Sequence, residues 1–330
     1  MFIRQSFFIF NSIFQTMRNF LIISLILLFQ CIQAQSDTLI IEKENLKWLQ
    51  TNKAGLDFSE VTFVNWSAGG SNSISTLLSF ISKLKYEQNN LVWKSSARMR
   101  FGLNKQENQR LRKTEDELEL ASSLGYRKDT LTNWYYSARF NFKTQFTNGY
   151  NYPDRNNEIS GLMAPGYLFI GAGAEYGKNL EKLSFYMSPL TFKSTLVLDE
   201  DLANAGSFGV KPAIFDEGGN MIKSGERVRT EMGILVTNSY GTQVLENIFI
   251  KNQLSLYTDY INSFGNIDID WEIVFDFKVN SYVNATLGSH IRYDNDVKTL
   301  VATEIEDEFE EKGAKVQWKQ ILGLGVSIDF

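Results

Sequence analysis

The sequence has almost no cysteine or histidine, the residues from which proteins build zinc, iron–sulfur and many redox sites. Its 330 residues include one cysteine, Cys31, and one histidine, His290. Zinc sites built from cysteines, iron–sulfur clusters and a disulfide framework are therefore excluded, and we expect neither a metal nor a cofactor. The net charge of −5 argues against a nucleic-acid partner, because such proteins carry a basic face.

Long hydrophobic runs are absent beyond the N-terminal region, which excludes a polytopic bundle of transmembrane helices. The one apolar run, residues 20–29, follows the basic Arg18 and ends shortly before Ala34, a small residue suited to precede a cleavage site. A basic start, an apolar stretch and a small residue are typical of a signal peptide. We therefore predict export and cleavage of residues 1–34, with Met17 as an alternative start.

From about residue 58 onward, apolar and polar residues alternate with the period of a β-strand. In residues 315–330, most even positions are apolar and most odd positions are polar or small. Strands in soluble proteins usually have about 5–6 residues, whereas long alternating segments in an even number are typical of outer-membrane barrels. The alternating segments are 58–68, 72–87, 91–106, 113–127, 133–147, 160–176, 183–197, 227–240, 246–260, 266–279, 282–296 and 315–330. The sequence thus predicts an all-β fold, a single closed antiparallel transmembrane β-barrel of about twelve strands over residues 58–330, ending at Phe330.

The connections between these segments alternate in length, as outer-membrane barrels require. The second, fourth and later even connections are short, whereas the odd ones are mostly longer, with 69–71 as the exception. We therefore expect the short turns in the periplasm and the long loops outside. Residues 35–57 are predicted to be a short periplasmic N-terminal segment outside the barrel, either packed at its mouth as a plug or loosely ordered.

Aromatic residues gather near both ends of the predicted strands. Amphipathic rings prefer the two membrane interfaces, where they form belts. The belt positions include Trp66, Trp93, Trp134, Trp271, Trp318 and Phe330. A soluble periplasmic β-sheet protein is a further alternative, because a soluble antiparallel sheet can also alternate.

Two of the four prolines, Pro165 and Pro189, lie inside the predicted strands. Proline has no amide hydrogen to donate to a strand ladder. We therefore expect a bulge or a bend at both positions.

Several sequence words are distinctive in combination. They are Asn65 to Ile74, Arg112 to Glu119, Asn141 to Phe146, Met163 to Tyr167, Ser188 to Thr191, Asn266 to Trp271 and Tyr293 to Asp296. With these words the chain resembles the uncharacterised outer-membrane β-barrel family called domain of unknown function 3078, typical of Bacteroidetes. The resemblance implies an outer-membrane barrel of a Gram-negative bacterium and carries no catalytic residues. Phe330 also resembles the terminal residue by which the outer-membrane assembly machinery recognises barrels.

If the apolar face meets lipid, the polar face lines the lumen and carries a charge network. The residues of this network are Arg98, Arg100, Glu117, Glu119, Arg139, Lys143, Arg229, Glu231, Asp270, Glu272, Asp276, His290 and Arg292. Antiparallel pairing across the loop near residue 108 would oppose Arg98 to Glu119 and Arg100 to Glu117. Pairing across the other turns would oppose Glu272 to His290, Asp270 to Arg292 and Lys251 to Asp276.

Two functions fit this lining equally well. The lumen could be a narrow pore for small solutes, since rings of charge set selectivity in pores. It could also be a structural barrel filled with salt bridges, because eight strands are filled by side chains and sixteen leave a channel. A membrane-embedded hydrolase using His290, with Glu272 orienting it beside a lumen serine, is an alternative from another class. The expected partners are the lipid bilayer, the outer-membrane assembly machinery and a small solute; the oligomeric state stays open.

Overall fold

The computed structural model describes residues 48–330 with the exception of 63–70, 262–263, 296, 298 and 303–308. The predicted signal peptide, residues 35–47 and Trp66 therefore lie outside the described residues. Among the residues that are described, no helix is long and apolar enough to cross a membrane.

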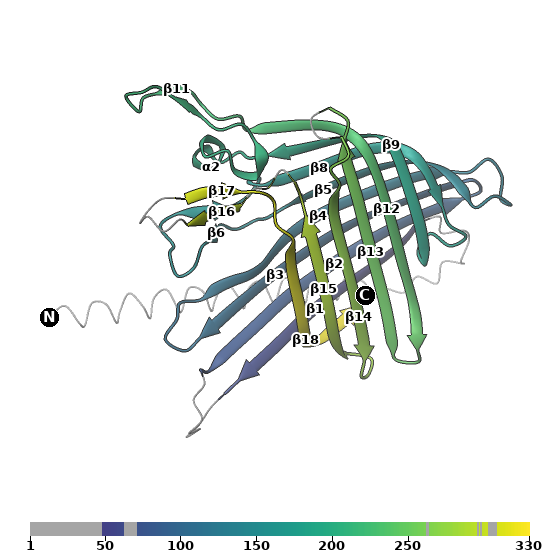
Figure 1. Cartoon of the computed structure of the whole chain (residues 1–330). Coiled ribbons are helices and arrows are strands. Elements are labelled where there is room, and N and C mark those ends of the chain that lie inside the picture. The colour runs from purple at the N-terminus through teal and green to yellow at the C-terminus, as the bar shows by residue number, and fades with distance from the viewer. Residues whose placement is uncertain (1–47, 63–70, 262–263, 296, 298, 303–308) are drawn as a thin grey trace. The chain divides into compact units, whose positions relative to one another are not determined.

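Within the described part of the chain, twelve long strands form one closed antiparallel barrel (Figure 1). The strands are β1 (Trp48–Val61), β2 (Ser73–Gln88), β3 (Leu91–Gln106), β4 (Arg112–Tyr126), β5 (Trp134–Thr144), β8 (Gly166–Tyr176), β9 (Leu183–Leu196), β12 (Val228–Leu245), β13 (Ile248–Asp259), β14 (Asp268–Lys278), β15 (Val283–Tyr293) and β18 (Gln317–Asp329). Each pairs with its sequence neighbour in the barrel, and β1 closes the ring against β18. The predicted architecture is confirmed, and eleven of the twelve predicted segments overlap an observed strand along most of their length. The largest differences among these eleven are that β8 begins later than predicted and that β12 ends later.

The first strand begins about ten residues earlier than the sequence predicted. It runs from Trp48 to Val61 and pairs with β2 along its whole length. Residues 48–57 are therefore part of the barrel wall and not of a separate periplasmic segment. The alternation is weaker here because inward positions hold Gly55 and Thr51 while outward positions hold Gln50 and Asn52.

The correction also removes the exception in loop lengths. With β1 ending at Val61, the connection to β2 spans residues 62–72 and is long like the other odd connections. The small elements all lie in these long connections, and Figure 1 shows several of them together at one end of the barrel. They are β6 (Gly149–Tyr150), β7 (Glu158–Ser160), α2 (Glu200–Asn204), η1 (Ser207–Gly209), β10 (Ile214–Phe215), β11 (Met221–Lys223), β16 (Thr299–Ala302) and β17 (Phe309–Lys312).

The longest connection, residues 197–227, has its own small core. Leu202 and Ala203 of α2 pack with Val197, Val210 and Ala164. Asp199 begins α2 by accepting a hydrogen bond from the Leu202 amide at 2.9 Å, which satisfies one of the free amides of the first turn. The longest of the long loops is thus a folded element at that end of the barrel.

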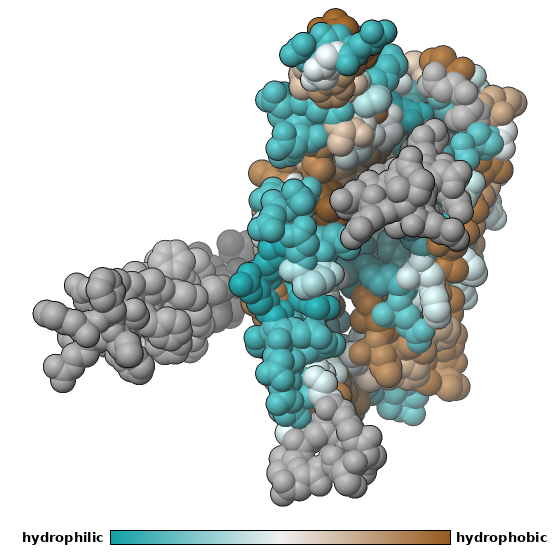
Figure 2. Space-filling view, turned by 60° about the vertical axis from the view of Figure 1, so that its left-hand side comes forward, coloured by the Kyte–Doolittle hydropathy of each residue, from teal (hydrophilic) through white to brown (hydrophobic). Residues whose placement is uncertain are grey.

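The outward face of the strands is apolar and exposed, as alternation predicts. On β18 the outward residues Leu322, Leu324, Val326 and Ile328 are 50–76% exposed. Figure 2 shows brown hydrophobic side chains over part of the barrel wall and teal side chains over the loops. Exposed apolar side chains in a continuous band are costly in water and favourable in lipid.

Three polar residues on the lipid-facing surface accept hydrogen bonds from tryptophan side chains. The indole N–H of Trp93 donates to Ser122 at 3.0 Å. The indole N–H groups of Trp271 and Trp318 donate in the same way to Asn252 at 2.8 Å and to Ser289 at 2.9 Å. An indole N–H without a partner is expensive away from water. These outward serines and asparagines therefore complete the belt rather than interrupt the apolar face.

The belt near the short turns gains a member that the sequence analysis did not assign. Trp48 packs between Tyr86, at 4.9 Å between ring centroids, and Trp93, at 5.4 Å. Trp134 contacts Tyr176 across the next strand pair at 5.0 Å. These contacts lie where the strands meet the short connections, so the side chains form part of an aromatic belt at that interface.

The expected irregularity at Pro189 is confirmed. The ladders from β9 to both β8 and β12 shift register beside Pro189. Before the bulge the even residues Ser184 and Tyr186 are buried, and after it the odd residue Lys193 is buried. Gly173 faces this bulge, where an added Cβ would lie 2.0 Å from the Met187 carbonyl oxygen. Pro165, by contrast, lies just before β8 begins and not inside the strand.

The barrel closes through a short joint. The β1–β18 register holds six residue pairs, from Lys53 opposite Asp329 to Phe58 opposite Leu324. Asn52 and Phe330 extend it by exchanging two backbone hydrogen bonds, at 3.0 and 2.9 Å. By comparison, β1 and β2 form fourteen pairs.

Candidate functional site

The lumen is lined by the polar face of the strands, and the register places its charges opposite each other. Arg98 lies opposite Glu119 and Arg100 opposite Glu117. Glu272 lies opposite His290 and Asp270 opposite Arg292. These four predicted oppositions are confirmed, because strand parity and the lengths of these two connections leave little freedom of register.

One predicted opposition is wrong by two residues. Lys251 lies opposite Val274, and Phe249 lies opposite Asp276. The Lys251 ammonium nevertheless reaches the Asp276 carboxylate diagonally, with 2.5 Å between Nζ and Oδ2. The connection between β13 and β14 is longer than a tight turn, so its centre could not be located from the sequence.

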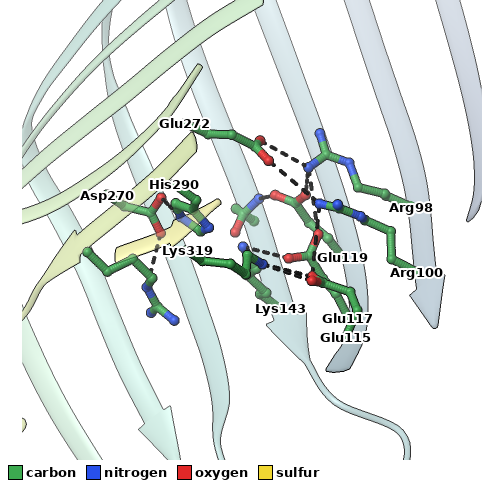
Figure 3. A network of polar contacts seen from close by, with 12 residues as sticks. Arg98, Arg100, Glu115, Glu117, Glu119, Lys143, Asp270, Glu272, His290 and Lys319 are labelled. Atoms are coloured by element: carbon green, nitrogen blue, oxygen red, sulfur yellow. Dashed lines mark hydrogen bonds and ion pairs between the residues drawn. The ribbon is translucent and has the colours of Figure 1, made fainter. Parts of the chain in front are cut away.

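Charged side chains from five strands meet in the middle of the lumen, in what we call the transverse network (Figure 3). Its members are Arg98, Arg100, Glu115, Glu117, Glu119, Lys143, Glu272 and Lys319. Arg98 contacts Glu119 at 3.3 Å and Glu117 at 3.6 Å. Lys143 of the next strand contacts Glu117 at 3.0 Å. Glu117 is therefore placed between two cations.

Some of these contacts cross the lumen. Glu272 of β14 lies 3.9 Å from Arg98 and 3.6 Å from Arg100 of β3, although four strands separate β3 from β14 along the wall. Lys319 of β18 likewise reaches Glu115 of β4 at 2.9 Å. The network therefore ties opposite walls together and narrows the lumen at this level.

His290 belongs to a smaller group beside the network. Its Nε2 lies 2.7 Å from Asp270 Oδ1, and Arg292 Nε lies 3.4 Å from the other Asp270 oxygen. Asp270, and not Glu272, is therefore the partner that orients the imidazole. Among the described residues, no serine hydroxyl is hydrogen-bonded to His290, and Ser289 faces lipid, where it accepts from Trp318.

Arg139 lies in a buried group nearer the short connections. It contacts Glu175 at 2.8 Å and donates to Ser184 and Thr237, both at 2.8 Å. Glu175 is 1% exposed and also accepts from Ser137 at 2.9 Å. This carboxylate was missed in the sequence, although its inward position in the segment 160–176 was a usable signal.

Arg229 and Glu231 lie in a second buried group, centred on Lys193 near the long loops. Lys193 contacts Asp268 at 2.8 Å and Glu231 at 3.3 Å, and Arg229 contacts Glu231 at 3.4 Å. Asp294 lies 3.9 Å from the same ammonium. Lys193 escaped prediction because the bulge at Pro189 reverses the parity of its strand.

A cavity of about 630 Å³ occupies the lumen. Its lining includes Lys85 and Glu181 near the short connections and Asp268 and Asp294 near the long ones. Members of the transverse network line its middle. Part of the lumen is filled instead, because Tyr186, Leu235 and Tyr257 pack together against one wall. The lumen is thus narrow and charged, with free volume along most of its length.

Among the described residues, no group of three or more histidine, cysteine, aspartate or glutamate side chains is arranged to hold a metal ion.

Comparison with known proteins gives one family match in sequence and several similar solved structures. The profile of a family described as Protein of unknown function (DUF3078) matches residues 58–150, which confirms the resemblance over that part of the chain. No curated protein matches the chain in sequence.

Among solved structures, the chain is similar to the translocator domain of the autotransporter NalP from Neisseria meningitidis, at 9% identity and a TM-score of 0.35, covering 92% of this chain and 94% of that one. It is also similar to an outer membrane channel from Pseudomonas putida F1, at 12% and 0.37, covering 85% and 95%. The NanC porin matches at 10% and 0.33, covering 84% and 97%. Scores this low carry no argument of their own, and the barrel rests on the strand pairing above.

The closed barrel and its apolar exterior place the protein in an outer membrane. A closed barrel satisfies its strand backbone groups internally, which lipid demands. The exposed apolar residues of the wall match the lipid core, and the aromatic contacts near the short connections match its interface. The lipid bilayer is therefore the environment of this chain, and such a surface argues against a soluble periplasmic sheet protein.

Proposed function

We propose that the protein is a narrow diffusion pore for small solutes, with the transverse network as its constriction. The observation that carries the proposal is the cavity of about 630 Å³, whose lining runs from Lys85 near the short connections to Asp294 near the long ones. A lumen that served only to stabilise the barrel would need no such volume. Twelve strands also lie between the filled eight-stranded barrels and the open sixteen-stranded porins.

The chemistry of the lining suits small hydrophilic solutes. Arg98 and Arg100 face the Glu272 carboxylate across the constriction, at 3.9 and 3.6 Å. Such pairs keep the lumen hydrated and polar, which suits hydrophilic solutes better than apolar ones. The folded loop core around α2 lies at the end with the long loops and would restrict access from outside.

The test is transport by the protein purified from outer membranes and reconstituted into liposomes. We expect swelling in monosaccharides and small charged solutes and none in long oligosaccharides. Heat-dependent electrophoretic mobility of the reconstituted protein verifies that the barrel is folded. Folded, inserted protein that gives no swelling with any small solute would overturn the pore and favour the structural barrel.

A further inference from the structure

Three lysines stand together on one wall of the lumen, towards the short connections. Lys85 of β2 lies directly opposite Lys94 of β3, and Lys83 lies opposite Ser96, two residues further along the same face. We call Lys83, Lys85 and Lys94 the lysine cluster. Like charges directly opposite in a ladder destabilise a sheet, so this arrangement opposes the stability of the wall that carries it.

The carboxylates of the lumen compensate this cluster unevenly. Lys85 contacts Glu87 and Glu181, both at 3.0 Å. Lys94 lies 3.7 Å from Glu175, but that carboxylate is held at 2.8 Å by Arg139.

Lys83 is the least compensated member. Among the described residues it has no carboxylate within 4.0 Å, and its side chain is exposed to the lumen. The charged groups that act on it most strongly are Lys251, Arg98, Glu181 and Lys53, of which only Glu181 is an anion.

The cluster faces the cavity together with neutral hydrogen-bond donors. Lys83, Lys85 and Lys94 all line the cavity, as do the hydroxyl residues Ser96 and Ser123 of the adjoining strands. Ammonium groups and hydroxyls are the donors that bind oxyanions, and hydrogen bonds between charged groups are the stronger ones.

We propose that the lysine cluster is a binding site in the lumen for small oxyanions, either carboxylates or phosphates, with Lys83 as its free ammonium. The site would give the proposed pore a preference for anions, and only in this respect does the inference rest on the proposed function. Binding itself requires a folded barrel with an accessible cavity and does not require conduction.

The experiment uses the purified full barrel in planar bilayers and in detergent. In a KCl gradient we expect a reversal potential on the anion side, and we expect citrate and inorganic phosphate, added separately, to reduce the KCl current. The same two anions are titrated in detergent by calorimetry. Lys83→Gln should weaken binding by about five-fold, the effect of removing one nearby unit charge in a hydrated site. Lys83→Arg should retain binding, and Lys128→Gln, an exposed lysine in the turn between β4 and β5, is the matched control.

The outcomes separate the two proposals. Binding without any conductance would overturn the pore and leave the oxyanion site standing. Conductance without anion preference, together with no citrate or phosphate binding in detergent, would overturn the site and leave the pore. An equal loss of binding in Lys83→Gln and Lys128→Gln would also overturn it, because the effect would then be general electrostatics. Binding of only one of the two anions would support the site and identify whether it recognises carboxylates or phosphates.

Discussion

The transverse network and the lysine cluster both include residues of the inward face of β3, Arg98 and Arg100 in the one and Lys94 in the other, yet their charges are arranged in opposite ways. In the transverse network every arginine faces carboxylates, and Glu272 meets two arginines from across the lumen. In the lysine cluster an ammonium faces an ammonium across the ladder, at Lys85 and Lys94. Arg98 and Lys94 are only four residues apart on β3, so the difference lies in the charges that the neighbouring strands place beside them.

Paired charges fix geometry, whereas unpaired charges remain available. A carboxylate held between two cations has little to offer a solute, but it holds two walls at a set distance. Lys83, which has no carboxylate within 4.0 Å among the described residues, forms no ion pair that stabilises the barrel wall. Its ammonium therefore remains available to bind an anion in the lumen. We expect substitutions in paired regions to change stability most and substitutions in the lysine cluster to change solute preference most.

The largest expected contrast is between two lysines of the same lumen. Lys193→Met leaves Glu231, Asp268 and Asp294 without their shared cation, and Lys193 is only 5% exposed. Removing one partner of a buried pair costs about 3–5 kcal/mol of the free energy of unfolding. Lys83→Met should change it by less than about 0.5 kcal/mol. Urea titration of the barrel in lipid vesicles measures both, and equal losses would contradict the contrast.

The second contrast concerns ion preference. Glu272→Gln removes the carboxylate that faces Arg98 and Arg100 without changing its shape, and should lower the free energy of unfolding by about 1 kcal/mol, since these pairs are part-exposed. It should shift the reversal potential further towards anions, because two arginines lose a counter-charge. Lys83→Gln should shift it the other way. Shifts of the same sign in both variants would show that the two regions do not act separately.

His290 lies beside the paired region and should behave like it. His290→Gln loses the hydrogen bond between Nε2 and Asp270, worth about 0.5–1.5 kcal/mol of the free energy of unfolding. Ion preference should stay unchanged, and no esterase activity is expected from the unmodified protein. An esterase activity that disappears in His290→Gln while the barrel stays folded would revive the hydrolase alternative.

The smallest expected effect is a difference in sign between two cross-strand pairs. A double-mutant cycle on Arg98 and Glu119 should give a favourable coupling of about 0.2–1 kcal/mol, and one on Lys85 and Lys94 an unfavourable coupling of similar size. Both should shrink in about 1 M salt, where screening acts over roughly 3 Å. A favourable Lys85–Lys94 coupling would contradict the reading of the cluster as repulsive.

Sequence alternation predicted most of the barrel because a strand in lipid must keep one apolar face. It failed at β1, where Gln50 and Asn52 face outward. The pairs between consecutive strands, such as Arg98 with Glu119, followed from strand parity and the centre of the loop that joins them. Contacts across the lumen, such as Glu272 with Arg98, depend on barrel curvature and could not be predicted. Lys193 was hidden by the bulge at Pro189.

The short joint between β1 and β18 has a consequence for how the barrel comes apart. Six residue pairs and the Asn52–Phe330 exchange hold this edge, while ten pairs hold β18 to β15. Strand ladders that are short open first, because fewer bonds break together. The β1–β18 edge is therefore the joint at which the closed sheet opens into an unclosed one, and Phe330 is part of that joint. Amide hydrogens on the β1 side of β18 should exchange with solvent deuterium before those between β9 and β12. Lipids that form a thinner bilayer should then shorten the lifetime of the closed barrel by opening this joint first.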